Sequence, residues 1–155
     1  TPIILTLLER FPGLSSFVVM VQKEVAERMT AKEGGSERSS FSVLCQWAYD
    51  VKGLFDLASG NFWPKPHVAS RTVVMTKKSD FPSCENPQLF IKMQRSLFSS
   101  RRKNVRNNLT AFTKSAERAE RALTLSALDP SLRAEALSLA ELLRLSDALN
   151  SVILS

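Results

Sequence analysis

The chain has 155 residues, of which 44% are hydrophobic, 23% are charged and only 5 are glycine. This composition excludes a disordered or fibrous protein, and the length suits one ordinary domain or a small domain with part of a neighbour. The 21 Lys and Arg against 15 Asp and Glu give a net charge of +6, which points to an anionic partner such as nucleic acid or a membrane surface.

The cysteine and histidine content argues against a metal site. Cys45 and Cys84 form no CxxC pair, and His67 is the only histidine, so the usual ligands of a zinc ion are lacking. We interpret both thiols as reduced and structural, as in a cytoplasmic protein. No apolar run reaches the length of a membrane span and no leader opens the chain, so we expect no membrane partner.

The first eighty residues are predicted to mix helices and strands. Thr1 and Pro2 open an apolar run that ends at the turn FPGL, which indicates a helix. Residues 15–22 (SSFVVMVQ) are rich in β-branched side chains and predict a buried strand. Residues 23–31 (KEVAERMTA) predict a helix, which is followed by a polar loop.

Strand patterns dominate from residue 41 onward. We predict strands at 41–51 (FSVLCQWAYDV) and 53–57 (GLFDL), with a bulge or tight bend at Lys52–Gly53, and another strand at 70–78 (SRTVVMTKK). This order of elements is typical of the C-terminal part of an α/β sheet, and we expect the first strands of that sheet to lie upstream of Thr1.

A linker with two prolines spans Ser79–Pro87, and the chain beyond it has helical periodicity throughout. If one helix continues through the region, five apolar residues share a stripe, although Ser99–Ser100 offers an alternative helix start. Asp129 before Pro130 predicts another helix start, and Ser138 with Glu141 forms a capping box. The stripe comprises Ile91, Phe98, Val105, Leu109 and Phe112.

These patterns predict an α/β unit followed by an all-α unit. We place the boundary near residue 80, with one domain at 1–80 and a second, helical domain at 81–155.

Positive charge is concentrated between Ile91 and Arg121, where nine Lys and Arg residues stand against two acids. Two interpretations stay open: a solvated helix face, or a surface that contacts phosphates. The single sign of the segment RRKNVRNN favours the second. Glu117 and Glu120 are expected to make surface ion pairs. The candidate contact residues are Lys92, Arg95, Arg101, Arg102, Lys103, Arg106, Asn107 and Asn108.

The segment Asn61–Ser70 (NFWPKPHVAS) is predicted to be a stiff, extended loop, because each proline fixes φ and restricts the residue before it. Phe62 and Trp63 are either core plugs or stacking platforms for an unpaired base, and both interpretations stay open at this point. Other classes of site have little support, since Gly34–Gly35 lies in a polar loop and no serine has a GxSxG context.

Four segments together resemble one family. They are MVQKEVAERM, FWPKPHVAS with the pattern FxPxPxVxS, LFSSRRKNVRNNL, and LDPSLRAEALSLAELLRLSDAL, and they occur in the expected order. The chain is similar over almost its whole length to the ribosomal RNA adenine dimethyltransferases, and most similar to the bacterial KsgA/RsmA type.

The resemblance implies a fold and a reaction. The fold is the C-terminal portion of a Rossmann-like class I methyltransferase sheet followed by a small helical domain, an α/β plus all-α class. The reaction uses S-adenosyl-L-methionine to dimethylate two adjacent adenosines near the 3′ end of small-subunit (16S) rRNA. The partner is this rRNA or the immature small ribosomal subunit in the cytoplasm, and the full-length protein is expected to be a monomer.

The resemblance also assigns roles to residues. Phe62 matches the phenylalanine of FxPxPxVxS, which lies against the target adenine, and the basic helical region contacts RNA. Trp63 holds a variable position of the motif, so its interpretation as a core residue stands. Arg38–Ser39 replaces a Tyr-Gly pair of many relatives, which leaves the role of that loop open. The family's cofactor motifs are not in this chain, and we expect it to have no turnover alone.

Two alternatives remain. The first is an Erm-type methyltransferase that modifies large-subunit rRNA, against which the closing helical segment argues. The second is a non-catalytic RNA-binding factor of ribosome assembly.

Overall fold

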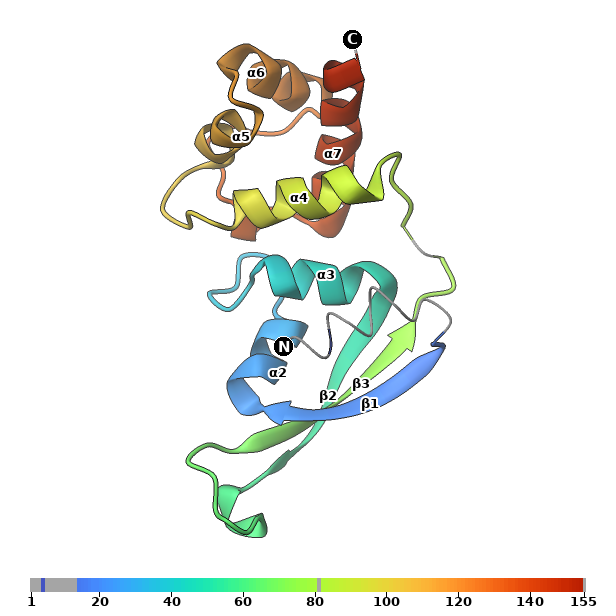
Figure 1. The fold of residues 1–155 in the computed structure, drawn as a ribbon, viewed down its shortest axis with the longest axis vertical. Helices are drawn as coiled ribbons and strands as arrows, with labels where there is room; N and C mark the ends of the chain where they lie inside the picture. Colours follow the sequence, from blue (N-terminus) through green and yellow to red (C-terminus); the bar gives the residue numbers. More distant parts are fainter. Residues whose placement is uncertain (1–3, 5–13, 81, 155) are drawn as a thin grey trace. The chain divides into compact units, whose positions relative to one another are not determined.

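The computed structural model describes residues 4, 14–80 and 82–154, which divide into two compact units (Figure 1). The first unit comprises residues 1–31 and 41–81, and the second comprises residues 32–40 and 82–155. The helix predicted from Thr1 to the FPGL turn lies outside the described residues, apart from Ile4, which is buried.

The first unit is built on a three-stranded antiparallel sheet. Its strands are β1 (Ser16–Gln22), β2 (Tyr49–Leu57) and β3 (Ser70–Lys77), in the order β1-β3-β2. The central strand β3 pairs along its length with β1 and, less regularly, with β2. The strands predicted at 15–22 and 70–78 are therefore confirmed, as is the helix after the first of them, which is α2 (Lys23–Thr30). The prediction that the first strand is buried is wrong, because β1 lies at the edge of this sheet and alternate residues of it are exposed.

The strand predicted from residue 41 is wrong over its first eight residues, because α3 (Ser40–Ala48) is a helix that leads directly into β2. Gln46 explains the helix: its amide donates to the carbonyls of Met29 and Ala31, at 3.0 and 2.9 Å. Ser42, four residues earlier, donates to the carbonyl of Arg28. Four residues span about 6 Å in a helix and about 13 Å in a strand, so only a helix brings both side chains to the end of α2.

Helices α2 and α3 cover one face of the sheet (Figure 1). The core on this face is formed by Ala26 and Met29 of α2, Cys45 of α3, and Val73 and Met75 of β3. The opposite face is open in the described structure, and a row of side chains alternating with those of the core is exposed there. This row includes Val18 and Met20 of β1.

The second unit is helical, as predicted. Its helices are α4 (Pro87–Leu97), α5 (Val105–Thr113), α6 (Ala116–Leu125) and α7 (Leu139–Leu154). No described helix is long and apolar enough to span a bilayer.

A single helix through residues 91–112, one of two alternatives for this region, does not form. The chain leaves the helix after Leu97 and starts again at Val105. The side chain of Asn104 caps the new helix by accepting the backbone N–H of Asn107 at 2.9 Å, so the cap is not Ser99–Ser100.

The two helix starts predicted near the C-terminus have different outcomes. Asp129 begins a turn, not a helix, because its carboxylate accepts the N–H of Ser131 at 2.8 Å. The capping box at α7 is confirmed: Ser138 Oγ accepts the N–H of Glu141 at 3.1 Å, and Glu141 Oε2 accepts the N–H of Ser138 at 2.8 Å. The bonds that the N–H and the hydroxyl of Ser138 donate to the Glu141 carboxylate lower the pKa of Glu141.

The loop at residues 32–40 belongs to the second unit although its flanking helices belong to the first. The N–H of Gly34 donates to the carbonyl of Glu135 at 2.8 Å. Arg38 is 2% exposed and donates through Nη2 to the carbonyl of Leu137 at 3.0 Å. Burial lowers the pKa of Arg38, and Glu33 opposes this shift. Arg38 therefore has a structural role: it anchors the loop at residues 32–40 beside the 3-10 turn at Ala134–Ala136.

The two thiols give a separate probe for each unit. Cys45 lies in the first core and burial raises its pKa to about 12, whereas Cys84 of the second unit is only half-buried. Because the thiolate is the reactive form, we expect Ellman's reagent at pH 8 to modify Cys84 first and Cys45 only when the first unit opens. A Cys84→Ser variant isolates the Cys45 signal. Fast native modification of Cys45 would contradict the closed core.

Candidate nucleic-acid interface

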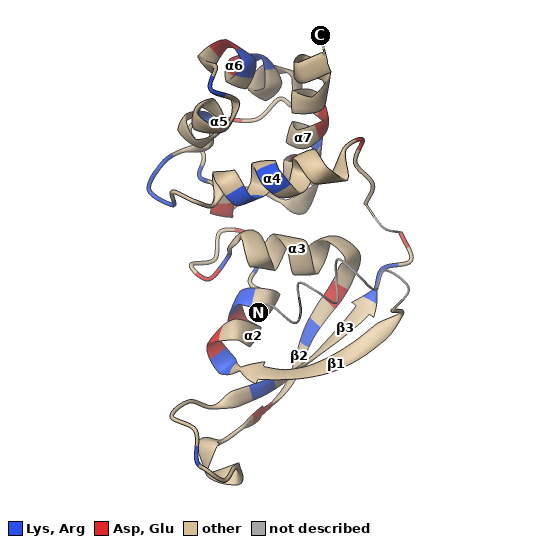
Figure 2. Cartoon of the chain, viewed as in Figure 1, with Lys and Arg blue, Asp and Glu red and all other residues tan. Residues whose placement is uncertain are grey.

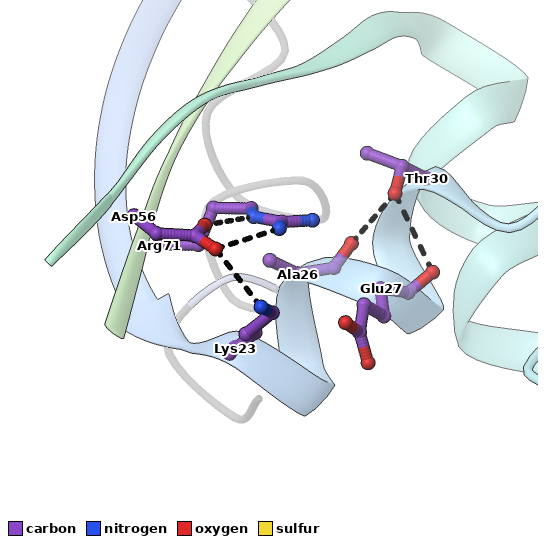
Figure 3. Close-up of polar contacts among 6 residues, drawn as sticks. All are labelled: Lys23, Ala26, Glu27, Thr30, Asp56 and Arg71. Atoms are coloured by element: carbon purple, nitrogen blue, oxygen red, sulfur yellow. Dashed lines mark hydrogen bonds and ion pairs between the residues drawn. The ribbon is translucent and has the colours of Figure 1, made fainter. Parts of the chain in front are cut away.

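The loop that carries Phe62 connects β2 to β3, and its two ends are joined by one carboxylate. Asp56 of β2 accepts from the guanidinium of Arg71 on β3, with 3.0 Å between Oδ2 and Nη2. The same Oδ2 lies 3.0 Å from Nζ of Lys23, at the start of α2 (Figure 3). We name Lys23, Asp56 and Arg71 the clamp.

The carboxylate of Asp56 is charged at neutral pH and lies between two cations. Hydrogen bonds from Arg71 and then from Lys23 hold the pKa of Asp56 well below its ordinary value, so the carboxylate stays charged. A backbone hydrogen bond also connects the loop to α2: the N–H of Lys23 donates to the carbonyl of Ala69 at 2.9 Å. The loop between Leu57 and Ser70 is thus restrained at both ends.

A β-bulge lies directly before the clamp. Gly53 pairs with Val73 and Asp56 pairs with Arg71, so Leu54 and Phe55 both oppose the single residue between those partners. A bulge of this kind bends the strand and redirects its side chains. Leu54 and Phe55 are exposed as a result. The bulge predicted at Lys52–Gly53 falls next to this position.

The two aromatic residues of the loop, Phe62 and Trp63, differ in exposure. After a 3-10 turn at Ser59–Asn61, Phe62 has extended backbone, with φ −124° and ψ 149°. Phe62 is half-buried, while Trp63 is 97% exposed and is followed by a cis Trp63–Pro64 bond. The interpretation of Trp63 as a core residue is therefore wrong. Consecutive side chains of an extended backbone point to opposite sides, so only one of the two can face the protein.

The second unit carries the basic candidates. Helix α4 buries Phe90, Met93 and Leu97, which leaves Lys92 and Arg95 exposed on its outer side. Figure 2 shows Lys and Arg along α4, in the loop that follows it, and on α6. The structure leaves exposed seven of the eight predicted contact residues, namely Lys92, Arg95, Arg101, Arg102, Lys103, Arg106 and Asn107.

Three of these cations, Arg95 among them, already have partners within the protein. Arg106 forms an ion pair with Glu120 across α5 and α6, which confirms the surface ion pair expected for Glu120. Arg101 donates to the carbonyl of Ser36 in the loop at 32–40. Lys92, Arg102 and Lys103 form no ion pair with any residue that the structure describes. These three are the cations most available to an external anion.

Asn108 is a correction to the predicted contact set. It is 3% exposed, and its amide donates to the carbonyls of Leu97, Ser100 and Lys103, at 2.9, 3.2 and 3.4 Å. Asn108 therefore holds the α4–α5 connection from inside and offers no donor to RNA. Helical spacing could have indicated this, because Asn108 follows the buried Val105 by three residues.

Sequence comparisons identify the family. The family model described as "Ribosomal RNA adenine dimethylase" matches residues 1–151. The chain belongs to the ribosomal RNA adenine dimethylase family. It is 43% identical to the "Ribosomal RNA small subunit methyltransferase A" of Treponema pallidum over 88% of this chain and 50% of that protein. The protein of the same name from Lactobacillus acidophilus is 36% identical over 94% and 50%.

Solved structures show the same fold. A dimethyladenosine transferase from Plasmodium falciparum matches with a TM-score of 0.81 at 24% identity, over 97% of this chain and 62% of that one. The 23S rRNA methyltransferase ErmE matches with a TM-score of 0.64 at 19% identity, over 96% and 59%. The predicted fold class is confirmed. The chain spans about half the length of the curated relatives it matches.

The described residues of this dimethylase family member do not fit a nucleotide-like cofactor. Such a site needs glycines at a strand-to-helix turn, where backbone N–H groups approach the ligand. Here β1 passes directly into α2 at Gln22–Lys23, and Gly34 and Gly35 lie in the loop at 32–40. No cluster of three metal-ligating side chains was found among the described residues.

The neighbouring asparagines allow a matched test of the interface. Asn108→Ala removes donors from buried carbonyls, so we expect the free energy of unfolding to fall by about 1–3 kcal/mol. Asn107→Ala removes an exposed side chain, so we expect a change within about 0.5 kcal/mol. Urea unfolding followed by circular dichroism measures both. Equal stability of the two variants would contradict the structural role of Asn108 and would again make it a candidate RNA-contacting residue.

Proposed function

We propose that these residues belong to an S-adenosyl-L-methionine-dependent rRNA adenine N6,N6-dimethyltransferase. Its substrate is a pair of adjacent adenosines near the 3′ end of small-subunit rRNA, modified during ribosome biogenesis in the cytoplasm. Family membership supports the reaction class, and the relatives' names support the small subunit. The observation that carries the site is Phe62, half-buried on a loop whose ends the clamp restrains.

Phe62 has the role of a stacking wall for the target adenine. An enzyme that modifies a base removes it from its stack and holds it against aromatic side chains. The half-buried ring of Phe62 is supported by the protein and keeps part of its surface open. The restrained loop ends reduce the entropy lost when the base is held, which favours a fixed position of the reacting amine.

The basic surface of the second unit has the role of binding phosphates. Lys92, Arg102 and Lys103 are exposed cations, and Asn107 adds an uncharged donor beside them. Phosphate contacts position a nucleic acid without reading its sequence. In this proposal the helical unit holds the RNA while the loop of the first unit presents Phe62 to the base.

The cofactor is bound outside these residues. S-adenosyl-L-methionine supplies the methyl group, but the described residues provide no site for it, and the relatives are about twice as long as this chain. We therefore propose that the 155 residues alone bind RNA without turnover and that the full-length protein, as a monomer, methylates. Methylation of small-subunit rRNA by the isolated chain would contradict this.

The small subunit is preferred to the large one. Relatives at 43% and 36% identity are named small-subunit enzymes, whereas ErmE at 19% identity supports the fold alone. Incubating full-length protein and cofactor with each rRNA tests the choice. Labelling of large-subunit rRNA would favour the Erm type, and no labelling of either, despite RNA binding, would favour a non-catalytic assembly factor.

Phe62→Ala in the full-length protein tests the stacking wall. Base stacking on an aromatic ring is worth about 1–3 kcal/mol, so we expect kcat/KM for rRNA methylation to fall about 5- to 100-fold. Cofactor affinity, measured by calorimetry, should not change. Phe62→Tyr, which keeps the ring, is the control and should retain most of the activity. Parallel losses of activity and cofactor affinity would return Phe62 to a purely structural role.

The salt dependence of RNA binding tests the basic surface. Each phosphate contact contributes about 0.7–0.9 to the slope of log K against log salt, so Arg102→Ala with Lys103→Ala should lower the slope by about 1.4–1.8. Lys32→Ala with Lys52→Ala is the matched control, because it removes two exposed lysines that lie outside residues 91–121. Equal reductions in both pairs would indicate unspecific attraction by net charge.

A further inference from the structure

Trp63 is the most exposed large apolar side chain that the structure describes. It is 97% exposed, although an indole is among the largest apolar groups a protein can bury. Leu54 and Phe55 at the bulge and Val68 in the same loop are also exposed. Grouped apolar exposure of this kind on one loop and its adjoining strand marks a contact surface more often than an accident of packing.

Trp63 does not share a ligand base with Phe62. The backbone at Phe62 is extended, so the two consecutive side chains point to opposite sides. Phe62 faces the protein and is half-buried, while Trp63 faces away from it. A base stacked on the indole is therefore a different base from one stacked on Phe62.

The surroundings of Trp63 favour an anionic partner. Between Leu57 and Ser70, the loop that carries Trp63, the sequence has one lysine, Lys65, and no Asp or Glu. Lys65 and His67 are exposed within the loop itself. An exposed aromatic ring beside a cation, on a loop that has no acid of its own, suits stacking on single-stranded nucleic acid.

The ring is also carried on a restrained segment. The clamp joins the loop's ends through Asp56, and Pro64 and Pro66 restrict the backbone directly after Trp63. A ring carried on a restrained backbone loses less conformational freedom when a base stacks on it, because only its side-chain torsions remain to be ordered.

We propose that Trp63 is a second stacking platform, which binds an unpaired nucleotide flanking the adenosine on Phe62. This inference rests on the proposed function for its choice of RNA. The rings of Phe62 and Trp63 lie on opposite sides of the loop backbone, so they hold the two nucleotides apart. The flanking nucleotide is then held on the indole while the target base occupies Phe62.

The test uses full-length protein with Trp63→Ala, Trp63→Leu and Trp63→Phe, and a single-stranded RNA of the target sequence. We expect Trp63→Ala and Trp63→Leu to weaken binding about 5- to 100-fold, and Trp63→Phe to retain most of the affinity because its ring still stacks. The slope of log K against log salt should stay at the unmodified value, since stacking releases no counterions. Leu154→Ala, another exposed apolar residue, is the control.

Several outcomes would overturn the proposal. Unchanged RNA affinity in Trp63→Ala would do so, and so would equal affinities of the leucine and phenylalanine variants, which would indicate apolar contact without stacking. Loss of binding to phosphatidylserine vesicles with unchanged RNA binding would assign the surface to a membrane. Because binding is read directly, the result stands apart from methylation: an inactive wild-type protein would refute the proposed function without deciding the role of Trp63.

Discussion

One carboxylate determines where the first unit presents its aromatic loop. Asp56 accepts from Arg71 across the β2–β3 pair and from Lys23 at the start of α2. The antiparallel pairing brings both ends of the loop together, and the clamp fixes these ends to the helix as well (Figure 3). The strand pairing and the clamp together restrict the loop's ends, which reduces the entropic cost of ordering Phe62 when a ligand binds.

In the proposed function, the two units contribute different physical interactions with RNA. The first presents aromatic surface on a restrained loop, where the interaction with a base depends on ring contact and little on ionic strength. The second presents cations on α4, α5 and the connection between them, where the interaction with phosphates depends strongly on salt. These separate dependences allow each contribution to be measured in the presence of the other.

Polar residues in the second unit show how residue type alone misleads. Asn104 caps α5, Asn107 is exposed, and Asn108 is buried against three carbonyls, although all three lie within one short segment. Arg38 likewise donates to a backbone carbonyl inside the unit and does not face solvent. A buried donor of this kind is needed because unpaired carbonyls in an apolar interior destabilise the fold.

The sequence by itself determined the family, and it determined the positions of β1, α2 and β3. It also determined the helical character of the second unit and the capping box at Ser138. Each of these features depends on a local pattern of residues or on a motif. Only the tertiary structure decided the helix at Ser40–Ala48, whose Ser42 and Gln46 bind carbonyls at the end of α2. It alone also revealed the clamp and the exposure of Trp63. These features depend on partners distant in sequence, or on the direction in which a side chain leaves the backbone, and neither is encoded in a local pattern of residue types.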